Sequence, residues 1–234
     1  ELKPSFSIRE LTRVFVAGET VSRERDITIL EGWTRKDIAE YLEKEGVTPA
    51  KEFLARTKEL EGYLFPDTYR IFKDATVEEI IVKMRANFDR KVTSEMRADI
   101  AKQKKTLDKI LIMASILERE VRTPEEMQIV SDIFWRRLAI GMPLQADSTI
   151  NFIVGEKRPR ATYDDLKIDS PYNTYKYRGI PPGPIGNPGL SAITAAIYPK
   201  KNDYWFFLTT EDDGRAIFGK TLDEHNRNRA KYLK

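Results

Sequence analysis

The chain has 234 residues, and its 40 lysines and arginines nearly balance its 37 aspartates and glutamates, for a formal net charge of +3. Such mixed charge argues against a dedicated nucleic-acid-binding protein, which carries a strongly basic face. There is no cysteine and only one histidine, His225, which excludes zinc sites built on cysteine or several histidines, cysteine nucleophiles, iron–sulfur clusters and disulfides. A Ser-His-Asp triad would need His225, which lies in a highly charged segment and is typical of a helix surface or cap.

The composition is that of a globular protein with one large or two small domains. No run of about 20 apolar residues is present, so we expect no membrane-spanning helix within this sequence. Because the first residue is Glu1 rather than methionine, the sequence reads as part of a longer protein whose signal or anchor segment would lie upstream. The absence of cysteine fits an extracytoplasmic compartment.

The first ninety residues predict a compact α+β unit followed by a helix. Alternating apolar residues predict a strand at 26–30, and capping residues then predict a helix from Thr34 to Gly46 and a second helix that begins at Thr48-Pro49. A second strand follows at 68–72. The capping box at 76–79 begins a helix that runs to about residue 90.

From about residue 93 the patterns are mostly helical. They predict a helix capped by Ser94, an apolar helix at 107–121, and a helix that runs from the capping box at 123–126 to Gly141. A polar turn at 144–149 then leads into 150–154, and a further helix is capped by Ser191. A hairpin of 204–208 and 215–218 around Asp213-Gly214 and a last helix capped by Thr221 complete the chain.

Residues 170–189 hold five prolines, four glycines and three tyrosines but no carboxylate. Regular structure is not expected there, because proline fixes φ and removes a backbone donor. A proline-stiffened wall of tyrosines could grip a polar, ring-shaped ligand. The alternative is a structural loop whose tyrosines pack on their own domain.

The helix at 107–121 is apolar all round from Ile110 to Leu117 except for Ser115, the mark of a buried helix. It ends in Glu118-Arg119-Glu120, where the helix dipole disfavours carboxylates. At 100° per residue the two glutamates point about 200° apart, so they cannot form a close pair. Desolvation and the dipole would raise the pKa of either carboxyl, as a general acid requires. The alternative is an ordinary helix-end glutamate paired with Arg119, Arg122 or Arg136.

Other residues could complete a polar cleft, although each has a packing or turn-forming alternative. Glu61 and Tyr63 lie where the two parts of the chain join. Further candidates are Gln145, Asp147 and Ser148 in the polar turn, with Tyr172, Asn173 and Tyr175 in the loop. A glycosidase usually needs a second carboxylate about 5 to 9.5 Å from the first. Glu61, Asp67 and Asp147 are available, but no pattern marks one as the partner.

Five ordered motifs resemble the endolytic murein transglycosylase family (MltG, YceG-like). They read EGYLFPD at 61–67, LIMASILERE at 111–120, GMPLQAD at 141–147, YNTY at 172–175 with GIPPG at 179–183, and NPG at 187–189. The resemblance covers about residue 26 to the C-terminus. It departs where the family commonly has Asp-Pro-Thr and this chain has Asp147-Ser148-Thr149.

The resemblance implies an α+β fold in two parts. The N-terminal region, 1–92, would hold a LysM-like βααβ subdomain at about 26–72 and a connecting helix. The mainly helical catalytic domain, 93–234, would carry the β-hairpin and the Pro/Gly-rich loop. Family members are held in the cytoplasmic membrane by one N-terminal helix, which would lie upstream of Glu1, with the enzyme on the extracytoplasmic side.

The implied activity is cleavage of peptidoglycan within the glycan strand, with formation of a 1,6-anhydromuramyl end and without metal or cofactor. The family's catalytic glutamate maps to Glu120, with Glu118 as the fallback. Substrate contacts are assigned to Glu61, Tyr63, Gln145, Asp147, Ser148, Tyr172, Asn173, Tyr175 and Asn187. The expected partners are glycan strands and wall-synthesis enzymes such as penicillin-binding proteins, not nucleic acid.

Two other functions remain open at this point. A non-catalytic peptidoglycan-binding scaffold would bind glycan without products. A hydrolase would use Glu120 with Asp147 or Glu61 as a second carboxylate and leave reducing muramyl ends.

Overall fold

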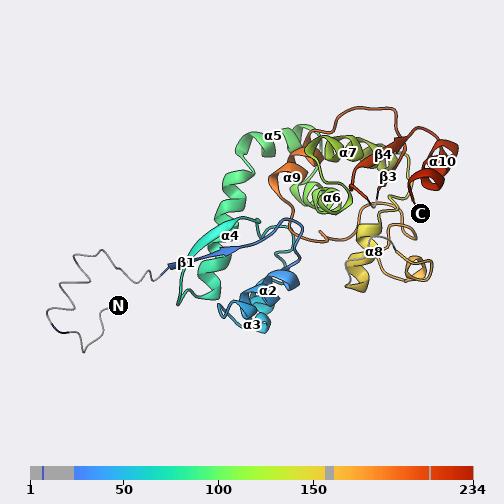
Figure 1. The fold of residues 1–234 in the computed structure, drawn as a ribbon. Helices are drawn as coiled ribbons and strands as arrows, with labels where there is room; N and C mark the ends of the chain where they lie inside the picture. The colour runs from blue at the N-terminus through green and yellow to red at the C-terminus, as the bar shows by residue number, and fades with distance from the viewer. Residues whose placement is uncertain (1–6, 8–23, 156–160, 211, 234) are drawn as a thin grey trace.

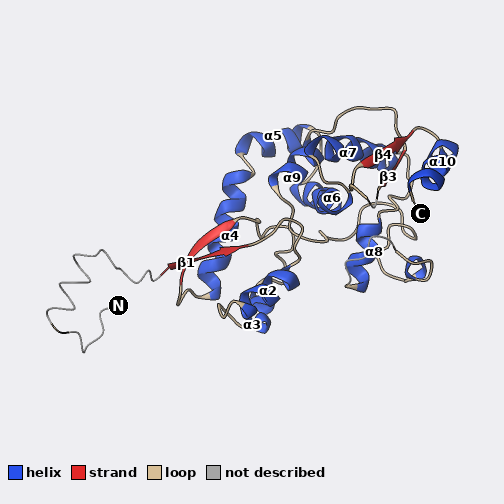
Figure 2. Cartoon of the chain, viewed as in Figure 1, coloured by secondary structure: helices blue, strands red, loops and turns tan. Residues whose placement is uncertain are grey.

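The computed structural model describes residues 7, 24–155, 161–210 and 212–233, and these form a mixed α+β protein (Figure 1). Its helices are accompanied by two small antiparallel sheets of two strands each, which lie far apart in the molecule (Figure 2). The α+β class expected from the sequence is therefore confirmed. Within the described residues no helix is both long and apolar enough to cross a bilayer.

The N-terminal unit has the strand–helix–helix–strand order that capping signals predict. Strands β1 and β2 pair antiparallel from Glu24↔Phe72 to Thr28↔Thr68. A small core of aliphatic residues with Phe53 lies between them and the helices. The predicted strand at 26–30 begins two residues earlier in the structure. The elements are β1 (Glu24–Thr28), α2 (Arg35–Lys44), α3 (Ala50–Arg56) and β2 (Thr68–Phe72).

Helix α4 (Val77–Lys91) connects this unit to the rest of the chain. Met84 packs in the core of the N-terminal unit, whereas Phe88, one turn later, packs in a second and larger core formed by the helices that follow. The predicted boundary at 92/93 falls just after this transition and stays a prediction. Helix α5 (Ser94–Lys102) is capped by Thr93, whose hydroxyl accepts from the Met96 N–H, so the predicted cap Ser94 is wrong by one residue.

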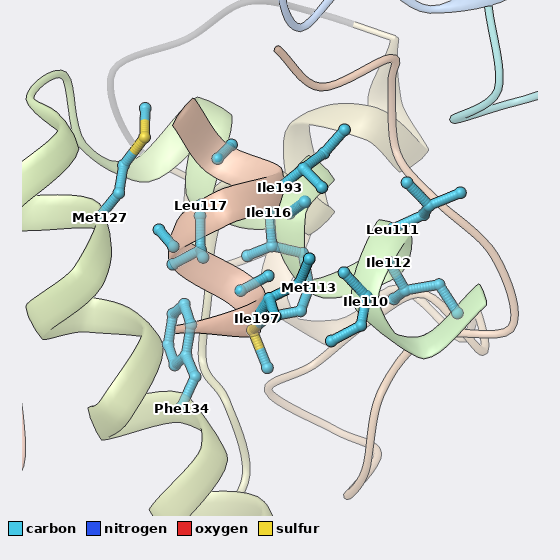
Figure 3. Packing of buried hydrophobic residues seen from close by; sticks show 14 of the residues in the cluster. Ile110, Leu111, Ile112, Met113, Ile116, Leu117, Met127, Phe134, Ile193 and Ile197 are labelled. Atoms are coloured by element: carbon cyan, nitrogen blue, oxygen red, sulfur yellow. The ribbon is translucent and has the colours of Figure 1, made fainter. Parts of the chain in front are cut away.

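The larger core is built around helix α6 (Leu107–Glu120), with α7 (Pro124–Ala139) and α9 (Leu190–Ile197) packed against it. Figure 3 shows side chains of the three helices meeting, with Ile116 and Leu117 of α6 beside Ile193 and Ile197 of α9. Every residue of α6 from Ile110 to Leu117 is buried, as its continuous apolar sequence predicts. The end of α6 therefore follows directly on a fully buried stretch of the helix.

Two helices begin at residues other than those that the sequence predicts. Helix α8 (Asp147–Val154) includes part of the expected polar turn, because Thr149 Oγ1 donates back to the Ala146 carbonyl at 2.7 Å. Helix α9 begins after Gly189 rather than after Ser191, because the Glu118 carboxylate accepts from the Gly189 N–H at 2.9 Å. That partner comes from another helix, which no local pattern reveals.

The remaining elements agree with expectation. Strands β3 (Phe206–Thr209) and β4 (Ala216–Gly219) form the predicted hairpin, and Thr221 caps α10 (Leu222–Tyr232). After the 3-10 turn η1 (Asp165–Lys167), residues 168–189 contain neither helix nor strand.

Candidate active site

A cavity of about 620 Å³ lies between the N-terminal unit and the larger core. Its walls come from the start of α2, the segment 58–63, one face of α6, the end of α8 and the Pro/Gly-rich loop. Of the residues that the sequence assigns to a cleft, Glu61, Tyr63 and Tyr172 line this cavity.

Glu61 is the carboxyl group of the cavity wall whose pKa is raised by burial. It accepts hydrogen bonds from the Arg35 N–H at 3.1 Å and from Asn187 Nδ2 at 2.9 Å, and 16% of its side chain is exposed. Burial raises the pKa of Glu61 to about 7, against the lowering effects of Arg35 and Asn187. It can therefore hold a proton near neutral pH at the cavity wall.

Aromatic rings form two parts of the cavity wall. The Tyr63 hydroxyl donates to Asp108 Oδ1 on α6, and burial raises the pKa of Tyr63 to about 12. The Tyr172 ring packs on Phe152 of α8 with centroids 5.0 Å apart. Such rings offer apolar faces to a ligand.

Asn187 joins the Pro/Gly-rich loop to the N-terminal unit. Its side chain is fully buried; Oδ1 accepts from the Leu64 N–H at 3.0 Å and Nδ2 donates to the Trp33 carbonyl at 2.9 Å. Its backbone N–H also donates to Trp33 O, and its carbonyl accepts from the Gly32 N–H, both at 2.8 Å. Asn187 thus shapes the cavity and holds Glu61, rather than lining the cavity itself.

Asn173 has a similar structural position. It is fully buried, its Nδ2 donates to the carbonyls of Leu166 and Ile168, and its Oδ1 accepts from the N–H groups of Tyr175 and Lys176. The structure therefore places the Asn173 amide in the interior of its own loop, and its assignment as a substrate contact stays a prediction.

Ser115 explains how the loop is attached to α6. This buried hydroxyl, the one polar group in the apolar stretch, donates to the Ile112 carbonyl at 2.8 Å and accepts from the Ile185 N–H at 3.0 Å. The loop is close enough there that a Cβ on Gly62 would lie 2.6 Å from Pro184 Cγ.

The two glutamates at the end of α6 face different parts of the protein, as the helical spacing predicts. Glu118 accepts from Gly189 at the start of α9 and lies against Gly32 of the N-terminal unit. Burial raises the pKa of Glu118 to about 7, and the nearby Glu31 contributes in the same direction. Its contacts all belong to the junction between the two cores.

Glu120 faces the start of α8. Its Oε1 accepts from the Ser148 N–H at 3.0 Å, and its carbonyl accepts from Thr209 Oγ1 of β3 at 2.8 Å. Burial raises the pKa of Glu120 to about 7, against the lowering effect of Ser148, while the charge of Asp147 adds to the increase.

Asp147 and Tyr175, both predicted site residues, lie next to Glu120. The Tyr175 hydroxyl donates to Asp147 Oδ1 at 2.5 Å, and burial followed by the charges of Asp147 and Glu120 raises the pKa of Tyr175. Gln145 adopts a left-handed backbone with φ of 55° and an exposed side chain just before α8. Four predicted residues, Asp147, Ser148, Tyr175 and Glu120, are thus brought together at one end of α8.

Neither glutamate of α6 lines the 620 Å³ cavity, but Arg119 between them does. On α6 the cavity-lining residues are Asp108, Ile112 and Arg119, which lie within about 40° on the helical wheel. On α8 the cavity reaches Asn151, three residues after Ser148. Glu120, which bonds to the Ser148 N–H, therefore lies beside the cavity-lining residues Arg119 and Asn151 without lining the cavity itself. The sequence reasoning missed Arg119 because it treated the arginine only as a partner for the glutamates.

Across the described residues, no group of three or more histidines, aspartates and glutamates is arranged to hold a metal ion. The chemistry that the site itself offers is proton transfer by carboxyl groups with pKa values near neutrality.

Comparison with known proteins settles the relationship. The model of the YceG-like family matches residues 1–231. The chain belongs to the YceG-like family. Curated relatives named endolytic murein transglycosylase include one from Bacillus subtilis, 41% identical over 74% of this chain, and one from Streptococcus pneumoniae strain D39, 34% identical over 79%. A crystal structure of a yceG-like protein from Listeria monocytogenes superposes with a TM-score of 0.78 and 36% identity, covering 97% of this chain and 82% of that one.

The YceG-like family membership therefore rests on both sequence and structure. The matched regions span 48% of the Bacillus subtilis relative and 34% of the Streptococcus pneumoniae relative. The chain thus corresponds to about half or less of these proteins.

Proposed function

We propose that this chain is the catalytic part of an endolytic peptidoglycan lytic transglycosylase, which cleaves the β-1,4 bond between N-acetylmuramic acid and N-acetylglucosamine. Support comes from the relatives' names and from a desolvated glutamate at the end of a buried helix. The accompanying proposals are that residues 26–72 form a LysM-like glycan-binding subdomain and that the enzyme is anchored on the extracytoplasmic side of the membrane. Penicillin-binding proteins are its proposed partners.

Glu120 is the proposed acid. Its pKa of about 7 leaves a substantial protonated fraction at neutral pH, and the Ser148 N–H fixes the orientation of the carboxyl group. The same N–H stabilises the carboxylate that remains after the proton is donated. Both halves of an acid–base cycle are thus provided at one side chain.

The proposed reaction needs only one carboxyl group. The Glu120 carboxyl donates its proton to the glycosidic oxygen, the bond from that oxygen to the muramyl C1 breaks, and an oxocarbenium-like state develops at C1. The C6 hydroxyl of the same sugar then attacks C1, and its proton goes to the Glu120 carboxylate. The products are a free 4-hydroxyl and a 1,6-anhydromuramyl end, with no water consumed. Attack within one sugar has a high effective concentration.

Glu118 has a structural role in this proposal. Its carboxyl group accepts from the N–H at the start of α9, and its side chain lies against the N-terminal unit. Glu118 would therefore hold the two cores together. Tyr63 and Tyr172 would pack against the bound sugars, and Gln145 would contact them from its position just before the first turn of α8.

A hydrolase is the second candidate, and Glu61 is the observation that favours it. A carboxyl group with a pKa of about 7 lines the cavity itself, as a second acid or base would. In that case water would attack C1, and the product would have a reducing muramyl end.

Digestion of purified sacculi, with products identified by mass spectrometry, tests the proposal. Anhydromuramyl ends from the wild-type chain, lost in Glu120→Gln but kept in Glu118→Gln, are expected. Reducing ends that disappear in Glu61→Gln would instead establish the hydrolase. Glycan binding with no product from the wild type would make the chain a non-catalytic scaffold. Circular dichroism of each variant verifies that it folds.

A further inference from the structure

Ser148 meets Glu120 with two polar groups, a backbone N–H and a side-chain hydroxyl. The N–H donates to Glu120 Oε1 at 3.0 Å. The side chain is buried, and Ser148 Oγ completes no hydrogen bond with any of the described residues. A buried hydroxyl without a partner costs folding free energy, so its presence beside a carboxyl group calls for an explanation other than stability.

The Ser148 side chain nevertheless acts on the Glu120 carboxyl group. Among the influences that lower the pKa of Glu120, this side chain is the largest and the Ser148 N–H is the second. The hydroxyl therefore lies near the carboxyl group without completing a hydrogen bond of normal geometry to it. Because a serine side chain can change rotamer and its hydroxyl hydrogen can turn, a short movement would complete the bond.

The two protonation states of Glu120 differ in how much they gain from a second donor. A protonated carboxyl group is itself a donor, whereas a carboxylate only accepts and has room for several hydrogen bonds. A hydrogen bond to an ionised acceptor is also about twice as strong as one between neutral groups. A second donor is therefore most stabilising once the carboxyl group has lost its proton.

We propose that the Ser148 hydroxyl is a second donor to Glu120, and that it completes its hydrogen bond when the carboxyl group gives up its proton. This inference rests on the proposed function and adds a positioning residue to it. The hydroxyl stabilises the carboxylate in the interval between proton donation to the glycosidic oxygen and proton removal from the C6 hydroxyl. Ser148 is also where the chain departs from the Asp-Pro-Thr that the family commonly has, and proline has neither an N–H nor a hydroxyl.

Other groups in the described part of the chain also act on the proposed acid. Asp147 of α8 raises its pKa, and Arg119 of its own helix lowers it. Tyr175 of the Pro/Gly-rich loop stays neutral because its own pKa is raised, and its hydroxyl donates to Asp147. From β3, the Thr209 hydroxyl donates to the backbone carbonyl of the acid. These groups are all kept when the Ser148 hydroxyl alone is removed, so a change in such a variant reports on Ser148.

The experiment is an NMR titration of the glutamate side-chain carboxyl carbons in the full chain, with the Glu120 signal assigned by its loss in Glu120→Gln. Ser148→Ala keeps the N–H but removes the hydroxyl, so the Glu120 midpoint should lie at higher pH than in the wild type. Ser148→Pro removes both donors and should move the midpoint further, and proline is tolerated in the first turn of a helix. The midpoints of Glu61 and Glu118, read from the same spectra, should stay in place.

Ser131→Ala on α7 is the matched control, because the Ser131 hydroxyl is also buried and also has no partner among the described residues. Both alanine variants should keep or exceed the urea midpoint of the wild type, since each removes an unpaired buried hydroxyl. Only Ser148→Ala should move the Glu120 titration. Its kcat/KM for anhydromuramyl release should likewise decline at higher pH than that of the wild type, because the acid stays protonated to higher pH.

An unmoved Glu120 midpoint in Ser148→Ala, or an equal shift in Ser131→Ala, would overturn the proposal. A raised KM with an unmoved midpoint would do the same, because the hydroxyl would then be a substrate contact. Product analysis of sacculi is read separately. A moved midpoint without anhydromuramyl ends would refute the proposed reaction and leave the pairing of Ser148 with Glu120 standing, whereas anhydromuramyl ends with an unmoved midpoint would refute only the role of Ser148.

Discussion

Asn187 and Glu61, 126 positions apart in the chain, are joined by a 2.9 Å hydrogen bond from the amide Nδ2 to the carboxyl Oε1. The same amide bonds to Leu64 and Trp33, so one side chain connects the Pro/Gly-rich loop to two segments of the N-terminal unit. The position of the cavity's acidic group therefore depends on a residue that is itself fully buried.

Replacing Asn187 with alanine should destabilise the protein by about 2–4 kcal/mol, because the buried N–H of Leu64 and the carbonyl of Trp33 would lose their partner. Urea unfolding measures this loss. The matched control is Asn226→Ala on the exposed face of α10, which should change stability by less than about 0.5 kcal/mol. Equal stability of the two variants would show that the Asn187 bonds are not needed.

Gly62, which packs against Pro184 of the Pro/Gly-rich loop, is the basis of a second prediction about stability. Gly62 has φ of +83°, and an added Cβ would lie 2.6 Å from Pro184 Cγ, so Gly62→Ala should cost about 2–4 kcal/mol through backbone strain and displacement of the loop. Gly46 has φ of +63° with open space around it, so Gly46→Ala should cost only about 1 kcal/mol. Thermal unfolding compares them. A similar loss in both variants would mean that the loop yields easily.

Much of the fold was predictable because its signals are local. The capping boxes at Thr76 and Thr123, the hairpin turn and the apolar stretch of α6 each depend on a few neighbouring residues. The start of α9 was missed because the N–H of Gly189, the residue just before it, donates to Glu118, which comes from another helix. Thr93 and Ser94 are equally good caps chemically, and the extended backbone of Thr93 decides between them.

The site was predictable in its parts but not in its arrangement. The helical period correctly separates Glu118 from Glu120, and the motifs bring Asp147 and Tyr175 to the same place. That Arg119 faces the cavity depends on how the Pro/Gly-rich loop packs across α6 at Ile185, which is a long-range contact. Asn173 was expected at the substrate, yet its amide is entirely used within the loop.

Three glutamates with raised pKa values make stability depend on pH. For Glu61, Glu118 and Glu120 the folded-state pKa is about 7 against an unfolded value of 4.5, so the folded protein binds more protons between these limits. Their contribution to stability is therefore fully present below pH 4.5 and is lost as pH rises toward 7. The urea midpoint should fall between pH 5 and pH 8.

Glu118→Gln should reduce this fall, because glutamine still accepts from Gly189 but has no charge to desolvate. We expect a gain of about 1–2 kcal/mol at pH 8, after allowance for solvent screening, and little change at pH 4.5. An equal effect at both pH values would exclude ionisation of Glu118 as the cause. The control is Glu125→Gln on the exposed start of α7, which should leave the pH dependence unaltered.

The charge of Asp147 supplies the last prediction, which concerns activity. A general acid must be protonated, so kcat/KM should decline as pH rises through the pKa of Glu120, about 7. Asp147 raises that pKa by repulsion, so Asp147→Asn should move the decline to lower pH. The control Asp164→Asn, an exposed residue paired with Lys167, should leave the profile in place. Rates of anhydromuramyl release measured from pH 5 to pH 9 give the profile. If the decline does not move in Asp147→Asn, and Glu61→Gln rather than Glu120→Gln abolishes the release, the proton comes from Glu61 and the assignment of the acid to Glu120 is wrong.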